Sequence, residues 1–408
     1  MKSEYDHGET TPSGYRRVLS NPQFGLILAI TFVGMLEAAL APALPAIADA
    51  LNVTDARVGL LITFFKIPSI LVVPVAAIVA DRYGRRVVIL PSLALFGVAG
   101  TAMFFVETFA LLLAMATVMG IGAAAIFPIT VTMLGDIYSG SANATAQGFR
   151  VAIVGIAAVS IPTLSGYLSG LSWNYPFALF ALAFPAIVLT SLYLRETIEP
   201  STSADGVSRL TRQYSGAIRS ELLDPNVRIL VLGGFVRGFV RYGVLTFIPL
   251  FAVRVLDASL FEAGALLAVR GFAYVFVSPV SGSIVGRIGR KRALIVAMLV
   301  STTALVVIPF SPTLLILAIA VFAYFTGDAL FDPVMKGAVT TIGDADYLAG
   351  VVNTLYVLKR TGQTVSPAIF GFVLMLFGYE TLFIVAGAIV FAYLVAFRTT
   401  FSASPRPP

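Results

Sequence analysis

The chain has 408 residues, of which 58% are hydrophobic and only 12% are charged, whereas a soluble domain carries about a quarter of its residues as charged ones. This composition excludes a soluble globular protein and predicts an integral membrane protein. There is no cysteine, and the only histidine is His7, so no residues are available for a disulfide, a thiolate metal site or thiol catalysis. We expect no cofactor and no enzyme activity.

Apolar runs of roughly 20 residues, long enough to cross the hydrocarbon core as helices, recur along the whole chain. We predict an all-α membrane protein with twelve spans, at about 23–45, 57–80, 87–106, 109–135, 148–170, 174–194, 227–252, 262–285, 293–310, 313–340, 349–376 and 380–397. The first run lacks a small-residue cleavage site ahead of a polar mature chain, so we interpret it as a span and not as a signal peptide.

The second half of the chain repeats the first at an offset of 205 residues. Glycine and proline constrain the backbone, and they coincide at Gly59 and Gly264, Pro74 and Pro279, Gly84 and Gly289, Gly122 and Gly327, Pro128 and Pro333, Pro162 and Pro367, and Gly166 and Gly371. We predict two six-helix bundles, 21–195 and 226–398, with tails at 1–20 and 399–408 and a linker at 196–225. Two fused repeats in a membrane imply a solute site between them.

Lysine and arginine gather on one side of the predicted spans. The side with both termini holds 17 of them, and the opposite loops hold two, Arg57 and Arg254. The positive-inside bias therefore predicts cytoplasmic termini, and the net charge of +6 requires no nucleic-acid partner. Short loops and compact length favour the plasma membrane of a bacterium or archaeon, and we expect a monomer in the lipid bilayer.

A charged motif, Asp81-Arg82-Tyr83-Gly84-Arg85-Arg86, follows the second span, and a weaker copy at 282–291 follows the eighth. Here the chain resembles the major facilitator superfamily, whose signature is G-x-x-x-D-R-x-G-R-R/K. Ala77 and Gly286 depart from it. The resemblance implies a cytoplasmic latch that closes in one transport state, formed by Asp81, Arg82, Gly84, Arg85, Arg86, Arg287, Gly289 and Arg290. Asp81 can pair with an arginine, and Gly84 permits a tight turn. The alternative is a plain positive-inside turn.

Two further family motifs match in part. The fourth span holds a glycine-rich stretch at 119–124, but Ala116 and Met119 stand where the family often has arginine and glutamine. The fifth span is similar to the antiporter motif of drug-efflux families at Gly148, Ala157, Ile161, Pro162, Ser165 and Gly166, of which Ile161 is a clear departure. The resemblance therefore points to the drug/proton antiporter-like branch with twelve helices.

Eleven charged residues remain inside the predicted spans. They are Glu37, Lys66, Arg150, Arg237, Arg241, Arg270, Asp328, Asp332, Lys336, Lys359 and Arg360. A charge near mid-bilayer costs several kcal/mol unless it faces a partner or water. None of the eleven lies in the third, sixth, ninth or twelfth span. We therefore predict that the charged helices line a central cavity and that the other four face lipid.

Three of these residues, Asp328, Asp332 and Lys336, recur every fourth position and share one helical face. Two carboxylates that close disfavour simultaneous ionisation, so one of them can bind a proton near neutral pH, as a proton-coupled carrier requires. The alternative is a static network in which Lys336, Arg237 and Arg241 keep both acids ionised.

Other intramembrane charges have a structural interpretation as well as a functional one. Glu37 is either a proton-coupling site or half of a buried ion pair. Lys66 and Arg270, at nearly equivalent repeat positions, can each neutralise a carboxylate. Arg150 lies near the cytoplasmic end of its span and can snorkel or pair with Asp136.

The intramembrane charges are eight basic and three acidic, which favours organic anions, although drug-efflux relatives tolerate mixed charge. The candidate substrate-cavity residues are Arg237, Arg241, Lys66, Arg270, Lys359, Arg360, Lys336, Phe127, Tyr324 and Tyr356. The leading hypothesis is a secondary active transporter of small organic solutes that works by alternating access, with proton-coupled efflux. The alternatives are a proton-coupled organic-anion symporter and a transport-inactive membrane sensor.

Overall fold

The computed structural model describes residues 18–198, 224–339 and 345–401, and these residues form helices without any strand. A bilayer offers the backbone no hydrogen-bonding partner, so apolar segments must pair their N–H and C=O groups internally as helices. Eleven helices of the described part are long and apolar enough to cross a membrane. The last of them turns at Gly378 (φ 79°), which divides it into two spans and gives the twelve predicted.

The six spans of the first half are built from twelve described helical segments. In chain order these are α2 (Pro22–Gly34), η1 (Met35–Ala39), α3 (Leu40–Ala50), α4 (Asp55–Val58), α5 (Leu60–Lys66), α6 (Ser69–Tyr83), α7 (Arg85–Ala102) with η2 (Met103–Phe105), α8 (Phe109–Ile137), α9 (Gly140–Leu171), and η3 (Tyr175–Leu182) with α10 (Ala183–Tyr193). The fifth span begins at Gly140, earlier than the predicted residue 148, because the small polar residues before Gly148 continue the helix beyond the apolar run.

The second half begins at residue 225, after the part of the predicted linker that lies outside the described residues. Its segments are α12 (Pro225–Val255), α13 (Leu260–Val277), α14 (Ser281–Ile288), α15 (Arg290–Val307) with η4 (Ile308–Phe310), α16 (Leu314–Val339) and α17 (Ala345–Thr400). Most of the two predicted tails, 1–20 and 399–408, also falls outside the described residues.

Three spans break where proline removes a backbone donor. Pro42 follows the 3₁₀ turn η1, Pro68 separates α5 from α6, and Pro279 separates α13 from α14. A hydroxyl group also binds a backbone carbonyl beside the first of these breaks. The Oγ of Ser165 donates to the carbonyl of Ala39 at 2.6 Å, so a residue of the fifth span stabilises the irregular backbone of the first.

The two halves meet where glycine lets helix backbones approach closely. Helix α9 packs on α13, and α4 and α5 pack on α17. A Cβ on Gly166 would lie 3.0 Å from the Cα of Gly264, and a Cβ on Gly371 would lie 2.5 Å from the carbonyl oxygen of Ala56. Because Gly166 and Gly371 are equivalent positions of the repeat, the same contact is made twice, once in each direction.

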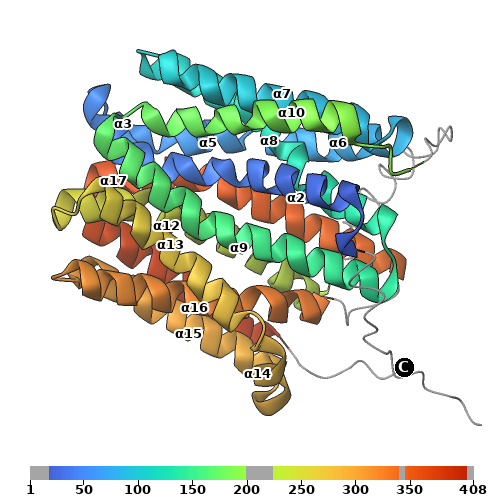
Figure 1. Ribbon diagram of the computed structural model, residues 1–408. Helices are drawn as coiled ribbons and strands as arrows, with labels where there is room; N and C mark the ends of the chain where they lie inside the picture. Colours follow the sequence, from blue (N-terminus) through green and yellow to red (C-terminus); the bar gives the residue numbers. More distant parts are fainter. Residues whose placement is uncertain (1–17, 199–223, 340–344, 402–408) are drawn as a thin grey trace, which may run out of the picture.

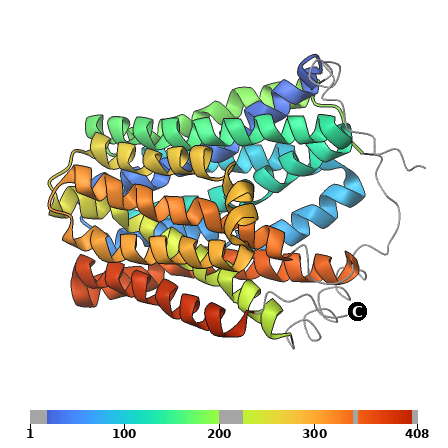
Figure 2. The same cartoon turned by 90° about the horizontal axis from the view of Figure 1, so that it is seen from below.

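The third, sixth and ninth spans lie at the edges of the molecule. Figure 1 shows α7 and α10 along one edge and α15 along the other, and Figure 2 shows the same helices from a second side. Large apolar side chains on these helices are exposed, among them Val98 of α7, Leu192 of α10 and Leu299 of α15. Their exposure agrees with the predicted lipid-facing role of these spans.

Candidate functional site

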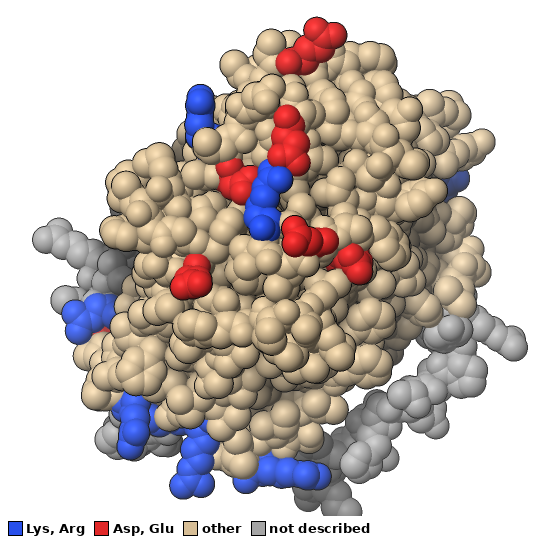
Figure 3. Space-filling model, turned by 90° about the vertical axis from the view of Figure 1, so that its left-hand side faces the viewer, with Lys and Arg blue, Asp and Glu red and all other residues tan. Residues whose placement is uncertain are grey.

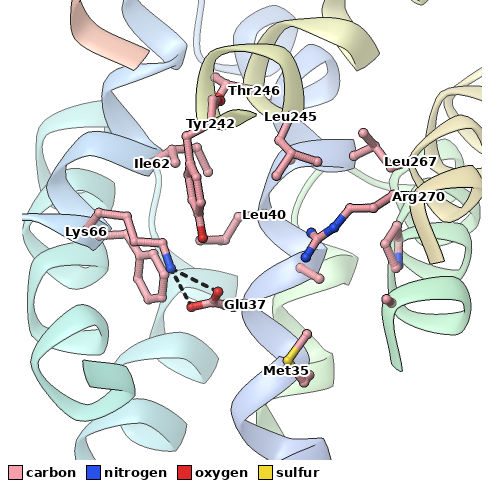
Figure 4. Close-up of a pocket in the computed structure, with 15 residues that line it drawn as sticks. Met35, Glu37, Leu40, Ile62, Lys66, Tyr242, Leu245, Thr246, Leu267 and Arg270 are labelled. Carbon is pink, nitrogen blue, oxygen red and sulfur yellow. Dashed lines mark hydrogen bonds and ion pairs between the residues drawn. The ribbon is translucent and has the colours of Figure 1, made fainter. Parts of the chain in front are cut away.

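A cavity of about 690 Å³ lies between the two halves, and we call it the seam cavity. Its lining comes from the first, second and fifth spans of one half and from the seventh and eighth spans of the other, as Figure 4 shows. Most of the lining is apolar. The charged and polar members are Glu37, Lys66, Tyr242, Thr246 and Arg270. A cavity therefore lies between the repeats, where the solute site was predicted.

An ion pair between Glu37 and Lys66 faces the seam cavity. The Nζ of Lys66 donates to both carboxylate oxygens of Glu37 at 2.9 Å, and the side chains are 13% exposed for Lys66 and 27% exposed for Glu37. Glu37 lies in the 3₁₀ turn η1 and Lys66 ends α5, so both sit at backbone breaks, where mid-helix irregularity often marks a functional hinge. Of the two interpretations of Glu37, a proton-coupling site or half of an ion pair, the geometry shows the ion pair. A role in coupling remains a proposal.

Lys66 also contacts two aromatic rings. Its Nζ lies 4.8 Å from the ring centroid of Phe65 and 5.1 Å from that of Tyr242, distances at which the face of a ring attracts a cation. Tyr242 belongs to α12 of the opposite half. Lys66 therefore contacts Glu37 and Phe65 of its own half and Tyr242 of the other, which links the ion pair to the relative position of the two bundles.

Arg270 enters the seam cavity from the side opposite to Lys66, as Figure 4 shows. Its guanidinium lies 5.7 Å from the ring centroid of Tyr274. It makes no hydrogen bond or ion pair with another residue of the described segments. The carboxylate that lines this cavity, Glu37, is bound by Lys66, so neutralisation of a carboxylate by Arg270 stays a prediction.

A second group of charges is buried inside the second half, around Asp328 of α16. Arg237 Nη2 lies 3.0 Å from Asp328 Oδ1, and Arg241 Nε lies 3.8 Å from Asp328 Oδ2. The hydroxyl of Tyr274 also donates to this carboxylate. The side chain of Asp328 is only 5% exposed. The Asp328 carboxylate is thus surrounded by two guanidinium groups and a hydroxyl donor.

Asp332 lies one turn further along α16 and binds three cations. Its carboxylate is 3.2 Å from Lys336 Nζ and 3.5 Å from both Lys359 Nζ and Arg237 Nε. Together with Asp328 and Arg241 these residues form what we call the α16 network, defined as Arg237, Arg241, Asp328, Asp332, Lys336 and Lys359. Its members join the seventh, tenth and eleventh spans.

The α16 network is incompletely hydrogen-bonded. The Nε and Nη1 atoms of Arg237 and the Nε of Arg241 are buried without a hydrogen-bond partner in the described structure. Buried polar atoms of this kind are uncommon in folded proteins and call for an explanation. One explanation is that the network has a second arrangement in another conformation.

Several predicted cavity residues lie outside the seam cavity. Arg237, Tyr324 and Asp328 line a second space of about 370 Å³ within the second half. Phe127 lies against Arg150, whose guanidinium carbon is 4.7 Å from its ring centroid, and Tyr356 is exposed. The rotation of each helix decides which of its faces meets the cavity, and apolar runs do not fix that rotation.

Arg150 does not pair with Asp136. Its Nε donates to Gln147 Oε1 at 2.9 Å, and Asp136 instead accepts from Arg85. Sequence reasoning missed Gln147, and it also missed Tyr274, which links Arg237, Arg241 and Asp328. A signal was present for Tyr274, because it follows Arg270 by four residues and so shares its helical face.

The charged motif after the second span forms contacts inside the first half. Arg85 bonds to Asp81 on the preceding helix and to Asp136 of α8, at 3.1 Å for Asp136. Gly84 has φ 102°, which confirms the predicted tight turn. Glu196, which sequence reasoning missed, accepts from the backbone N–H groups of Arg85 at 2.7 Å and Arg86 at 3.1 Å, so a carboxylate caps the positive end of α7.

The other members of the predicted latch include one arginine against a ring, one exposed arginine and a second turn glycine. Arg82 lies 5.3 Å from the ring centroid of Tyr83, and Arg287 is exposed. Gly289 has φ 81° and repeats the turn of Gly84, immediately before Arg290 begins α15. The copy of the motif in the second half thus keeps the turn, whereas its acidic position holds Gly286.

The opposite end of the molecule is closed by polar contacts between the halves. This end, where α3 finishes at the left of Figure 1, is called the distal face below. Arg254 of α12 binds Asp49 at 2.5 Å and Asp55 at 3.2 Å, and the hydroxyl of Tyr379 donates to Asp55 at 2.7 Å. Figure 3 views this end, where acidic side chains surround a central basic one.

The family model for the Major Facilitator Superfamily matches residues 26–269 and 230–408, and therefore nearly the whole chain. The chain belongs to this superfamily. Its members are membrane transporters and not enzymes, which confirms the family and the twelve-helix fold predicted above.

Curated relatives carry names that refer to export or drug resistance. The chain is 30% identical over 145 residues to the "Bacillibactin exporter" of Bacillus subtilis (strain 168), 34% of this chain and 36% of the relative. It is 24% identical over 325 residues to "Multidrug transporter protein MdtP" of the same strain, and the match covers 68% of this chain and 60% of the relative. It thus spans about a third and about 60% of the lengths of these two relatives. A third, "Quinolone resistance protein NorA" of Staphylococcus aureus (strain COL), is 21% identical over 85% of this chain and 87% of its own.

Solved transporter structures also superpose on this chain. The nucleoside transporter NupG (D323A mutant) superposes with a TM-score of 0.78 at 13% identity, over 93% of this chain and all of that one. A bacterial homolog of the human lysosomal transporter Spinster gives a TM-score of 0.74 at 18% identity, over 94% of this chain and all of that one. At such low identity these similarities establish the fold alone.

Proposed function

We propose that this superfamily member is a secondary active transporter that exports small organic solutes by alternating access and draws on a proton gradient. The seam cavity is the observation that supports this most. It is a mostly apolar cleft with a few charged and polar groups, as pockets for small organic ligands commonly are. Charged groups reach it from both halves, at the position where fused-repeat transporters bind their solutes.

The contacts of the distal face act as one gate in this proposal. Arg254 and Tyr379 of one half bind Asp49 and Asp55 of the other, so the cavity opens to that side only when these contacts separate. At the other end, the bonds of Arg85 to Asp81 and Asp136 join helices of one half. We therefore interpret the conformation as open towards the cytoplasm. The distal face then lies outside the cell and both termini lie inside, in the plasma membrane.

The proton-coupling step is assigned to Asp328. In this conformation its carboxylate lies against Arg237 and Arg241 and accepts a hydrogen bond from Tyr274. Movement of α12 relative to α16 would carry Arg237 and Arg241 away from Asp328. A buried carboxylate without a counter-charge favours its protonated form. The unsatisfied atoms of Arg237 and Arg241 are the feature that argues against a static network.

The test is proton movement in liposomes that contain the purified protein and an internal pH-sensitive dye. Two probes are offered as substrates, the anion fluorescein and the cation rhodamine 123, which share a three-ring framework. We expect a gradient of a transported probe to drive protons in the opposite direction. Liposomes that contain the Arg57→Gln variant serve as a matched control, because Arg57 is an exposed residue outside the seam cavity.

The direction of the protons separates the alternatives. Protons that move with the probe would support symport and overturn the exporter mechanism. Saturable probe binding without any flux would favour a transport-inactive sensor. Probe flux that does not depend on the pH gradient would support transport and overturn proton coupling.

A further inference from the structure

The three intramembrane carboxylates of the chain leave part of its intramembrane positive charge without a partner. Glu37 binds Lys66, and Asp328 and Asp332 bind the four cations of the α16 network. Arg150 is held by an amide and a ring. Two guanidinium groups, those of Arg270 and Arg360, have no hydrogen bond or ion pair with any residue of the described segments.

Both of these arginines lie near the seam cavity. Arg270 lines it directly, and Figure 4 shows its guanidinium directed towards the centre. Arg360 of α17 is close enough to Glu37 and Tyr242, two lining residues, to interact with them electrostatically. Both side chains are partly exposed, so a ligand in the cavity can reach them.

An unpaired guanidinium inside a membrane protein is costly because the medium around it solvates charge poorly. Glu37 forms its described ion pair with Lys66, at 2.9 Å to both oxygens, and none with Arg270. A cationic ligand would meet two unpaired positive charges and a carboxylate that is already neutralised. An anionic ligand would supply the counter-charge that these two arginines lack.

We propose that the seam cavity binds an organic anion whose carboxylate, sulfonate or phosphate is held by Arg270 and attracted by Arg360. The planar guanidinium fork matches the oxygens of such groups and binds them in a bidentate way. The apolar lining, including Met35, Ile62, Phe65 and Leu267, takes the aliphatic or aromatic body of the same molecule. This proposal rests on the proposed function of the seam cavity as the substrate site.

The test compares the binding of fluorescein and rhodamine 123 to the purified full-length protein at neutral pH, by fluorescence polarisation. These probes have nearly the same size and opposite charge. We expect saturable binding of fluorescein and weak binding of rhodamine 123. Arg270→Gln should weaken fluorescein binding by roughly tenfold to a hundredfold, the usual effect of losing a charge-assisted bond. Arg270→Lys should recover part of it, and Arg360→Gln should have a smaller effect.

Controls exclude a structural role for Arg270. Thermal unfolding of Arg270→Gln without probe should match that of the unchanged protein, and Arg57→Gln should bind fluorescein normally. The proposal is overturned if the unchanged protein shows no saturable fluorescein binding, if it prefers rhodamine 123, or if Arg270→Gln binds fluorescein as tightly as before.

The outcome is separable from that of the transport proposal. Fluorescein binding that depends on Arg270, without any flux in liposomes, would support the anion site and overturn the transport proposal. Proton-coupled flux of rhodamine 123 without fluorescein binding would do the opposite.

Discussion

The two halves of the molecule share a backbone but divide their charges unequally. The second half contains the α16 network, Arg237, Arg241, Asp328, Asp332, Lys336 and Lys359. At the positions 205 residues earlier the first half has Phe32, Leu36, Ala123, Phe127, Val131 and Val154. Every equivalent residue is apolar, although the helices that carry them correspond one to one.

The features that the halves do share concern backbone geometry. Gly84 and Gly289 both have positive φ, 102° and 81°, and Gly166 and Gly371 both permit close contacts across the seam. Packing imposes the same backbone demands on each copy, so these residues recur. A buried charge costs free energy wherever it stands. The difference therefore suggests that the second half has taken on most of the buried titratable chemistry.

Two repeat-equivalent pairs meet across the seam. Asp49 and Arg254 form an ion pair although they occupy the same position of the repeat, 205 residues apart. Glu37 and Tyr242, also equivalent, both contact Lys66. Residues related by a two-fold axis approach each other only near that axis. Both contacts therefore lie close to the pseudo-two-fold axis, and rocking of the halves must change them.

The largest effect should come from locking the distal face. The chain has no cysteine, so Asp49→Cys with Arg254→Cys gives a single pair of thiols, one in each half. A thiol-cleavable methanethiosulfonate cross-linker that spans the distance of the lost ion pair should stop nearly all probe flux, because the halves can no longer separate at this end. Addition of a reductant should restore the flux.

The control for this experiment is a pair of thiols inside one half, at Asp55 and Asp49. Both residues lie on the distal face and bind Arg254, but a link between them leaves the halves free to rock. Equal inhibition by both links would contradict a gate at the distal face.

Asp328→Asn should have the next largest effect. The neutral amide leaves Arg237 and Arg241 without their buried carboxylate, and loss of one partner from such a pair costs about 3–5 kcal/mol. We expect proton-coupled flux in liposomes to fall to background, with exchange of probe for probe retained. Ala123→Asn introduces the same amide at the equivalent position of the first half and removes no charge. Unchanged coupling in Asp328→Asn would refute the assignment of the coupling step.

The sequence predicted the fold and the charged helices because both follow from the bilayer. A run such as that of α16 must be a helix there, and Asp328 and Asp332 must avoid lipid. The partner of each charge was not predictable, because it depends on contacts between distant segments. Asp136 had both Arg85 and Arg150 within plausible reach, and only the packing of α7 on α8 selects Arg85.

Aromatic residues were harder still to place from the sequence. Tyrosine in an apolar run is compatible with lipid, with a packed core or with a polar contact. Tyr274 proved to be a hydrogen-bond donor to Asp328, whereas Tyr356 is exposed. The division of the charges between the seam cavity and the α16 network likewise depends on helix rotation, which the apolar runs leave undetermined.

The ion pair of the seam cavity offers a smaller test. Glu37→Gln leaves Lys66 without its carboxylate in a site where the lysine side chain is 13% exposed. Because Glu37 is partly solvated, we expect a loss of only about 2 kcal/mol in unfolding free energy, below the usual cost for a fully buried pair. Thermal unfolding of Glu37→Gln, Lys66→Met and the double variant measures it. The double variant should be more stable than Glu37→Gln alone, and strictly additive losses would argue that the pair contributes nothing.

The smallest effect compares the two glycine turns directly. Alanine is strained at positive φ by roughly 1 kcal/mol, and this applies to Gly84 at 102° and to Gly289 at 81°. At Gly84 a methyl group would also collide with the carboxylate of Glu196, whereas at Gly289 nothing described lies within 4 Å. Gly84→Ala should therefore lower the unfolding temperature more than Gly289→Ala. Glu196→Ala removes the obstacle and the cap together, so Gly84→Ala should cost less in that background. If both glycine variants lose the same stability in both backgrounds, the contact of Glu196 with the turn has no energetic role, and the two halves are equivalent here in energy as well as in backbone shape.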